Sequence, residues 1–142
     1  MTIKKVAVIG GGTMGSGIAE VAAKSGCDTI VVEIDASLAE QAQKKLEVST
    51  EKAVSREKMT DEDRSGLLSR ISFTTNFDEL TDRDLVIEAV VESPSVKASV
   101  FKTLDEIVQK DGILASNTSS ISIGDIGNNT SRAVSYTHLT LP

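Results

Sequence analysis

The amino-acid sequence predicts an α/β fold in which helices cover both faces of a doubly wound parallel sheet. Short apolar runs alternate with stretches that carry apolar residues at helical spacing, and this alternation requires parallel strands joined by helices. A cluster of glycines directly follows the first apolar run, at residues 10–12. Acidic residues close the second run, about 20 positions after the glycines. These features are typical of open sheets that bind ligands at the carboxyl ends of their strands.

The first part of the chain predicts a strand, a helix and a second strand. Residues 6–9 are continuously apolar, as in a strand buried on both faces, and glycines end the run. Apolar residues then follow helical spacing over about 14–24, and Ser25-Gly26 predicts the end of that helix. A β-branched run at 29–32 predicts the second strand.

The polar segment 36–69 is expected to form a helical hairpin that projects from the sheet. It contains helix formers up to about residue 55 and a second helix start at Thr60-Asp61-Glu62-Asp63, a capping-box pattern. Beyond the hairpin, apolar runs predict three more strands, and a proline at a first helical position predicts another helix. We expect these strands at 71–74, 84–91 and 113–117, that helix behind Ser93-Pro94, and a short helix from about Ser122.

Composition restricts the classes of function. The chain has 142 residues and a net charge of −6, with 39% hydrophobic and 25% charged residues, which is typical of one domain with a true core. It lacks the dense basic patch that a nucleic acid or an anionic membrane requires. Cys27 has neither a disulfide partner nor a His/Cys cluster beside it, and the N-terminus lacks a signal-peptide core. We therefore expect a cytoplasmic protein that binds small molecules and no metal.

The glycine cluster is part of a dinucleotide-binding motif, Gly10-Gly11-Gly12-Thr13-Met14-Gly15, between the first strand and the first helix. The first glycine permits a tight turn, the second lets the backbone approach a pyrophosphate, and the third lets helix and strand pack closely. The N–H groups and positive dipole end of the helix then face the phosphates. The glycines alone would be explained by a tight turn, but their position favours a Rossmann-type fold that binds a dinucleotide.

Two acids compete for the adenosine ribose. Glu33 ends the second strand at the edge where the ligand is expected, whereas Asp35 directly precedes a helix and suits its N-cap. We therefore assign Glu33 to the ribose hydroxyls. A carboxylate there repels a 2′-phosphate and no arginine follows to neutralise one, so the sequence favours NAD over NADP.

Polar residues follow the fourth and fifth predicted strands, at the edge where open parallel sheets bind ligands. Glu92 follows the fourth strand, and Asn117, Thr118 and Ser119 follow the fifth. Loops rich in hydroxyl groups often only satisfy backbone groups. Lys97 lies at the N-terminal end of a helix, where the dipole disfavours a cation. It is therefore either a structural residue or a partner of Glu92 at the mouth of a cleft.

Three stretches resemble the NAD-binding domain of the L-3-hydroxyacyl-CoA dehydrogenases, over about Ile3 to Ala133. The first, which many dehydrogenases share, is V-A-V-I-G-G-G-T-M-G-S-G-I-A at 6–19. The other two are more specific, D-L-V-I-E-A-V-V-E at 84–92 and I-L-A-S-N-T-S-S at 113–120. The resemblance implies an oxidoreductase of fatty acid β-oxidation that interconverts an L-3-hydroxyacyl-CoA and its 3-ketoacyl-CoA by hydride transfer with NAD.

The resemblance implies a role for each matching residue. It assigns the glycine loop to the pyrophosphate, Glu33 to the ribose, and Glu92 and Lys97 to the nicotinamide half, with Asn117 among the cofactor-binding residues. Ser119 matches a serine that hydrogen-bonds the substrate oxygen near the nicotinamide, so it is the catalytic candidate.

On the expected hairpin, Ser49 and Arg56 match positions that contact coenzyme A. Glu33 stands where the family usually has aspartate, which keeps the carboxylate but lengthens it. Arg56 stands where the family usually has lysine, which keeps the charge but changes the donor geometry.

The last residues depart from the family. A catalytic His-Glu pair is expected, with the histidine in H-F-F-N-P, but His138 is the only histidine of the chain and stands in S-Y-T-H-L-T-L-P. Residues 134–142 resemble a translated sequencing adapter, so we expect a non-native tail after a Rossmann domain at 1–133 that is incomplete at its C-terminal end. The expected parent enzyme is a homo-oligomer through a helical domain that follows, and this chain alone is expected to be inactive.

Two other interpretations stay open at this point. Another NAD-dependent β-hydroxyacid or sugar-acid dehydrogenase would share the fold but would not bind coenzyme A on the 36–69 hairpin. A non-catalytic dinucleotide-binding module would explain the missing general base.

Overall fold

The computed structural model describes residues 2–90, 93–116, 131 and 134–136. These residues contain a six-stranded sheet in the order β3-β2-β1-β4-β5-β6, and every neighbouring pair of strands is parallel. This is the strand order of a doubly wound dinucleotide-binding fold. The elements are β1 (Lys5–Ile9), α1 (Thr13–Lys24), β2 (Asp28–Val32), α2 (Ala36–Ser55), α3 (Asp61–Arg70), β3 (Ile71–Thr74), the 3₁₀ helix η1 (Phe77–Leu80), β4 (Leu85–Glu88), α4 (Pro94–Ile107), β5 (Ile113–Ser116) and β6 (Val134–Tyr136).

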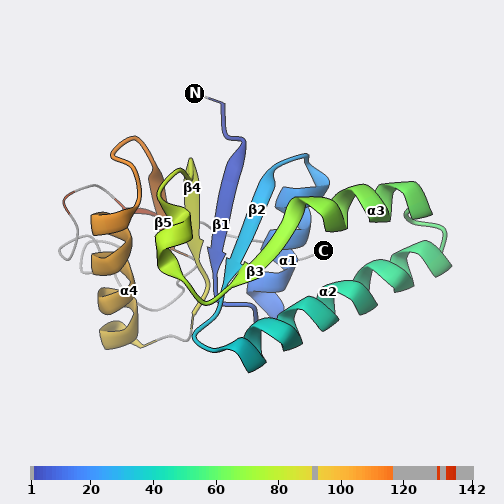
Figure 1. Ribbon diagram of the computed structural model, residues 1–142, viewed down its shortest axis with the longest axis horizontal. Helices are drawn as coiled ribbons and strands as arrows, with labels where there is room; N and C mark the ends of the chain where they lie inside the picture. The colour runs from blue at the N-terminus through green and yellow to red at the C-terminus, as the bar shows by residue number, and fades with distance from the viewer. Residues whose placement is uncertain (1, 91–92, 117–130, 132–133, 137–142) are drawn as a thin grey trace.

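Different helices cover the two faces of the sheet (Figure 1). Side chains alternate along a strand, so β1 contributes to both cores. The face covered by α1, α2 and α3 has a core of Val6, Val8, Ile18, Ala19, Ala23, Val31, Leu46, Leu67, Ile71, Ile87 and Ala115. The face covered by α4 and η1 has a core of Ala7, Ile9, Ile30, Val32, Leu80, Val86, Phe101, Leu104, Val108 and Leu114.

The predicted strands and helices of the first 116 residues are found in the structure, and so are their caps. Asp35 caps α2 by accepting a hydrogen bond from the Leu38 N–H at 2.8 Å. Thr60 caps α3 by accepting from the Asp63 N–H at 3.0 Å. Pro94 is the first residue of α4, as expected. The expected short helix from Ser122 lies outside the described residues.

Two details differ from the prediction. The fourth strand was expected over 84–91, but β4 ends at Glu88 because that residue's side chain, and no neighbouring strand, accepts the Val90 N–H at 2.7 Å. The helix η1 was not predicted at all. Its start is marked by Asn76, whose side chain accepts from the Asp78 N–H at 3.0 Å.

The sheet also has a strand that the sequence interpretation left out. Val134–Tyr136 forms β6 and pairs in parallel with Leu114–Ser116 of β5. These residues were assigned to a non-native tail beyond an incomplete sheet, on spacing and resemblance alone. Valine and tyrosine favour extended backbone, and this propensity suffices for a short edge strand. The origin of residues 134–142 stays a prediction.

The hairpin of α2 and α3 projects from the β3 side of the sheet, as expected (Figure 1). Arg64 on α3 ties the two helices together. Its Nε donates to the Thr50 hydroxyl at 3.0 Å and its guanidinium donates to the Glu47 carbonyl at 3.2 Å, both on α2. Leu46 and Leu67 anchor the hairpin in the core beside α1. These contacts attach α2 to α3 and to the core of the sheet.

Charges clamp the amino ends of β1 and β4. The Asp84 carboxylate accepts from the N–H groups of Lys4 and Lys5, both at 2.9 Å. The Lys5 ammonium lies 2.8 Å from the Asp82 carboxylate, and Arg83 lies 3.0 Å from it on the other side. Hydrogen bonds from Lys5 and then Arg83 lower the pKa of Asp82 from its usual 3.8 to about 2.

The depressed pKa of Asp82 predicts a pH-dependent contribution to stability. A carboxyl whose folded-state pKa is lowered stabilises the fold above its unfolded pKa and loses this effect as the pH falls through its folded pKa. The free energy of unfolding of Asp82→Asn should therefore lie below that of the original chain at about pH 6, and the gap should close between about pH 4 and pH 2. Urea unfolding at a series of pH values measures it, and a gap independent of pH would contradict the assignment.

A candidate dinucleotide site at the carboxyl edge of the sheet

The loop between β1 and α1 is held by contacts that only glycine permits. Gly10 has φ +101°, in the left-handed region that favours glycine. Its N–H donates to the Val32 carbonyl at 2.9 Å. A Cβ atom at Gly10 would lie 2.8 Å from the Ala89 carbonyl oxygen, and a Cβ atom at Gly15 would overlap the Gly10 carbonyl oxygen itself. The first helix therefore packs directly on the loop, as the motif predicts.

Gly12 differs from these two glycines because nothing lies within 4 Å of the position of its missing Cβ. Gly12 is the N-cap of α1 and provides no side chain to satisfy the first turn. The first N–H groups of a helix have no intrahelical acceptor, so those of Thr13 and Met14 are free to bind an anion together with the helix dipole. Open space beside uncapped N–H groups fits a pyrophosphate.

Glu33 lies beside this loop, whereas Asp35 lies at the start of α2. The Glu33 carboxylate accepts a hydrogen bond from the Gly11 N–H, and its side chain is half-buried. Asp35 is exposed and is used as the cap of α2. The structure thus separates the two acids in the way that the sequence predicted, with Glu33 alone facing the candidate site.

An apolar cavity of about 400 Å³ opens next to Glu33. It lies between the ends of β1, β2 and β4 and the first turns of α2 and α4. Its walls are Ile9, Gly10, Gly12, Val32, Glu33, Ile34, Leu38, Phe77, Ala89, Val90, Val96 and Val100. Sequence reasoning missed the apolar wall residues Phe77, Val96 and Val100, because helical apolar residues at these positions read as ordinary core.

The residues of this site fit NAD. The cavity offers aliphatic walls for an adenine ring, Glu33 offers a carboxylate that can accept from ribose hydroxyls, and the first turn of α1 offers N–H groups for the pyrophosphate. Among the described residues, neither a lysine nor an arginine lines the cavity, so these walls provide no cation for the 2′-phosphate of NADP.

Lys97 contacts Glu88, whereas its expected partner Glu92 lies outside the described residues. The Lys97 side chain is fully buried, and its ammonium lies 2.5 Å from the carboxylate of Glu88, which is also fully buried. Glu88 accepts a further hydrogen bond from the Ser116 hydroxyl at 2.7 Å. The sequence marked Lys97 as unusual but missed Glu88 and Ser116, which read as parts of apolar strands.

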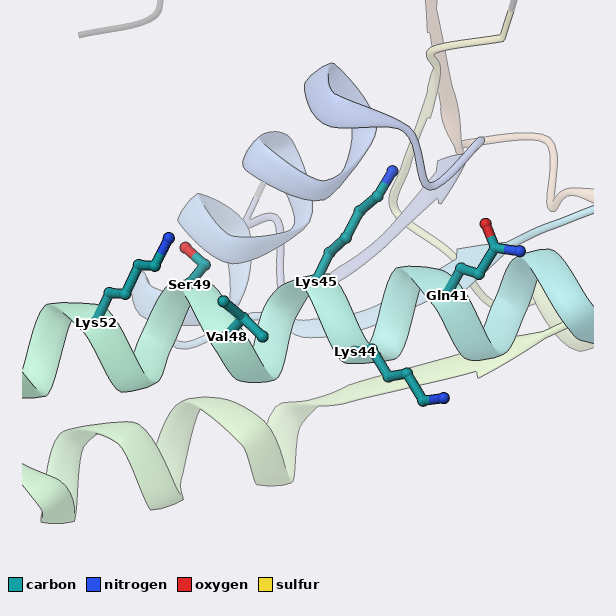
Figure 2. Close-up of a pocket in the computed structure, with 6 residues that line it drawn as sticks. All are labelled: Gln41, Lys44, Lys45, Val48, Ser49 and Lys52. Atoms are coloured by element: carbon teal, nitrogen blue, oxygen red, sulfur yellow. The ribbon is translucent and has the colours of Figure 1, made fainter.

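Ser49, one of the two residues expected to contact coenzyme A, lies on the outer face of α2. A shallow hollow there is lined by Gln41, Lys44, Lys45, Val48, Ser49 and Lys52. Figure 2 shows Lys45, Ser49 and Lys52 on the side of α2 that faces α1, while Lys44 points the other way. The Ser49 hydroxyl donates to Glu20 of α1 at 3.1 Å.

Arg56 stands apart from this hollow, as the exposed C-cap residue at the far end of α2.

Several expected site residues lie outside the described part of the chain: Glu92, Asn117, Thr118, Ser119 and His138. Among the described residues, no three potential metal ligands form a cluster. No helix within the same ranges has the length and apolar character needed to cross a membrane.

Comparison with known proteins places the chain beside a set of dehydrogenases. Residues 5–142 match the family model described as 3-hydroxyacyl-CoA dehydrogenase, NAD binding domain. The 3-hydroxybutyryl-CoA dehydrogenase of Mycobacterium tuberculosis is 47% identical over 122 residues, which are 85% of this chain and 43% of that protein. The one from Clostridioides difficile is 42% identical over 128 residues, or 90% and 46%.

A solved structure agrees with these relatives. The crystal structure of (S)-3-hydroxybutyryl-CoA dehydrogenase from Ralstonia eutropha superposes with a TM-score of 0.94 at 36% identity, and covers 98% of this chain and 50% of the other. The chain thus spans about half the length of the proteins that it matches, or less.

Alanine substitutions at Gly12 and at Gly15 should have opposite effects on folding. Gly12→Ala has room in the fold, so its melting temperature should fall by only a few degrees, about the effect of a poor N-cap. Its added methyl group occupies the open space beside the free N–H groups, so NADH should bind about tenfold more weakly or worse. Gly15→Ala should unfold the chain instead, because its methyl group meets backbone. Calorimetry and thermal melts measure both, and unchanged NADH binding by a folded Gly12→Ala variant would remove the phosphate site from this loop.

Proposed function

Because the chain belongs to the 3-hydroxyacyl-CoA dehydrogenase family, as its NAD-binding domain, we propose that it supplies the cofactor half of an enzyme that interconverts an L-3-hydroxyacyl-CoA and its 3-ketoacyl-CoA. One observation supports this most: the uncapped first turn of α1, the Glu33 carboxylate and the apolar cavity lie together around the open side of Gly12. Each fits one part of NAD.

The residues of this chain bind and orient the cofactor. When bound, NAD supplies the hydride acceptor or donor at its nicotinamide ring. The first turn of α1 holds the pyrophosphate and Glu33 accepts from the adenosine ribose. Glu92, Lys97 and Asn117, which the family resemblance assigns to the nicotinamide half, would hold that half of the cofactor.

Ser119 is the residue that we propose for the reaction itself. It follows β5, so its hydroxyl can donate to the substrate oxygen that gains charge as the ketone is reduced. A single donor of this kind contributes about 10²–10³ in turnover. The proton transfer belongs to a His-Glu pair for which this chain has no match, so we propose that the chain alone does not turn over 3-hydroxybutyryl-CoA.

We propose that the outer face of α2 is the platform for coenzyme A. The family resemblance names Ser49 and Arg56, and Lys45 and Lys52 add two cations on the same side as Ser49 (Figure 2). These cations suit the phosphates of coenzyme A, and the hollow beside Val48 suits an apolar part of the ligand. The platform separates this function from that of a β-hydroxyacid or sugar-acid dehydrogenase, whose substrates carry no coenzyme A.

The proposal also covers the compartment and the oligomeric state of the whole enzyme. We propose a cytoplasmic homo-oligomer, with the cytoplasm favoured by the single unpaired thiol of Cys27. Subunit contacts would come from a helical domain that follows the cofactor domain.

Cofactor choice tests the ribose assignment. The chain should bind NADH about tenfold more tightly than NADPH or better, because Glu33 repels the 2′-phosphate. Glu33→Ala should narrow this ratio. Asp35→Ala is the matched control, since it removes a carboxylate two residues away and costs about 1 kcal/mol of helix capping but should leave the ratio unchanged. Equal affinities for NADH and NADPH in the original chain would refute the assignment.

Binding of coenzyme A tests the platform. Lys45→Ala and Arg56→Ala should each weaken the binding of acetoacetyl-CoA by about two- to fivefold, the effect of one exposed charge, and added salt should reduce the difference. NADH affinity should not change. Lys102→Ala removes the same charge from the exposed side of α4, away from the hollow, and should have no effect. Titration calorimetry separates these cases, and equal losses in all three variants would mean that only net charge matters.

A further inference from the structure

A fully buried ion pair lies beneath the carboxyl edge of the sheet. Neither Glu88 at the end of β4 nor Lys97 in the first turns of α4 has exposed surface. Lys97 Nζ lies 2.5 Å from Glu88 Oε2. Taking two charges out of water costs several kcal/mol each, and apolar residues of similar size often stabilise a fold as well or better. Stability alone is therefore a weak reason for this pair.

The Glu88 carboxylate joins three segments at this point. Oε2 accepts from Lys97 Nζ and from the Val90 N–H, the latter at 2.7 Å. Oε1 accepts from the Ser116 hydroxyl at 2.7 Å. One carboxylate thus fixes the first part of α4, the turn after β4 and the last residue of β5 relative to one another.

Each of these segments borders the proposed cofactor site. The turn after β4 contains Ala89, whose carbonyl packs on Gly10, and Val90, which lines the apolar cavity. Ser116 is the last residue of β5, directly before the residues proposed for the nicotinamide half and the substrate. The end of β2 borders the same cavity from another side, where Glu33 accepts from the Gly11 N–H and not from a group that Glu88 holds.

We infer that Glu88 is a positioning residue for the nicotinamide half of NAD, because its buried carboxylate sets the ends of β4 and β5 and the start of α4. Lys97 contributes to the same arrangement, since its buried ammonium lies 2.5 Å from the Glu88 carboxylate. This inference rests on the proposed NAD-binding function and adds a residue, Glu88, that never touches the ligand.

A pair of ligands tests the inference on the 142-residue chain. ADP-ribose contains the adenosine, the pyrophosphate and the second ribose of NAD⁺ and lacks only the nicotinamide ring. Ser116→Ala removes one donor to Glu88 and keeps both charges. It should weaken NAD⁺ binding by about threefold to tenfold and change ADP-ribose binding by less than about twofold. Ser99→Ala, on the exposed side of α4, is the matched control and should change neither affinity.

The charges themselves are tested by a paired substitution. Glu88→Gln removes the carboxylate that lies 2.5 Å from the buried Lys97 ammonium, so the melting temperature should fall sharply. The double variant Glu88→Gln/Lys97→Met buries no charge, so the melting temperature should recover. NAD⁺ affinity should stay about tenfold reduced in this stable double variant, and ADP-ribose affinity should fall by less, because Val90 also lines the adenosine cavity. Since Lys97 is itself proposed for the nicotinamide half, the Ser116→Ala comparison, which keeps Lys97, separates positioning by Glu88 from a direct contact of Lys97.

The outcomes separate positioning from stability. Recovery of both the melting temperature and NAD⁺ affinity in the double variant would overturn the inference and leave the pair a structural feature. Equal losses of NAD⁺ and ADP-ribose would overturn it as well. If the double variant does not fold, the Ser116→Ala comparison decides alone. If the original chain binds neither ligand, the proposed function itself fails, which these variants do not affect.

Discussion

The direct packing of α1 on the loop after β1 is the constraint on which the site depends. Gly15 leaves no room between the helix and the Gly10 carbonyl, and Gly10 leaves little room before the Ala89 carbonyl. The loop is therefore fixed from the helix side and from the β4 side at once. This places the first turn of α1 at the edge of the sheet, between the cavity that Glu33 borders and the turn that Glu88 holds. A larger residue at either glycine would move all of these groups together.

The sequence alone predicts the part of the molecule that follows local rules. Buried parallel strands appear as apolar runs, and glycine, proline and capping residues mark helix ends, so β1, α1, β2 and the hairpin are predicted nearly to the residue. Local chemistry also separates Glu33 from Asp35, because a capping position is visible in sequence. The glycine motif can be identified for the same reason, because each glycine meets a backbone requirement that its spacing in the motif indicates.

The remaining features depend on contacts between distant segments, and sequence patterns do not show them. Lys97 and Glu88 are unusual residues for buried positions, but only the folded chain shows that they neutralise one another. The sequence alone suggests that Phe77 is one more core residue, whereas in the structure η1 places it in the wall of the cavity. The strand β6 was missed because an edge strand needs only a short extended stretch and a neighbour to pair with. Resemblance names Ser119 but cannot supply its geometry.

The central position of β1 also shapes the order in which the chain can fold. One edge of β1 pairs with β2, which follows after a single helix, whereas the other pairs with β4, and the Lys5 N–H finds its Asp84 acceptor 79 positions later. Contacts this distant in sequence slow folding, because a long loop must close before they form. During synthesis β1 can pair with β2 while its second edge is still unpaired, because β4 has not yet been made. An apolar strand with an open edge can pair with other chains, so this interval is when the nascent protein most needs protection from aggregation.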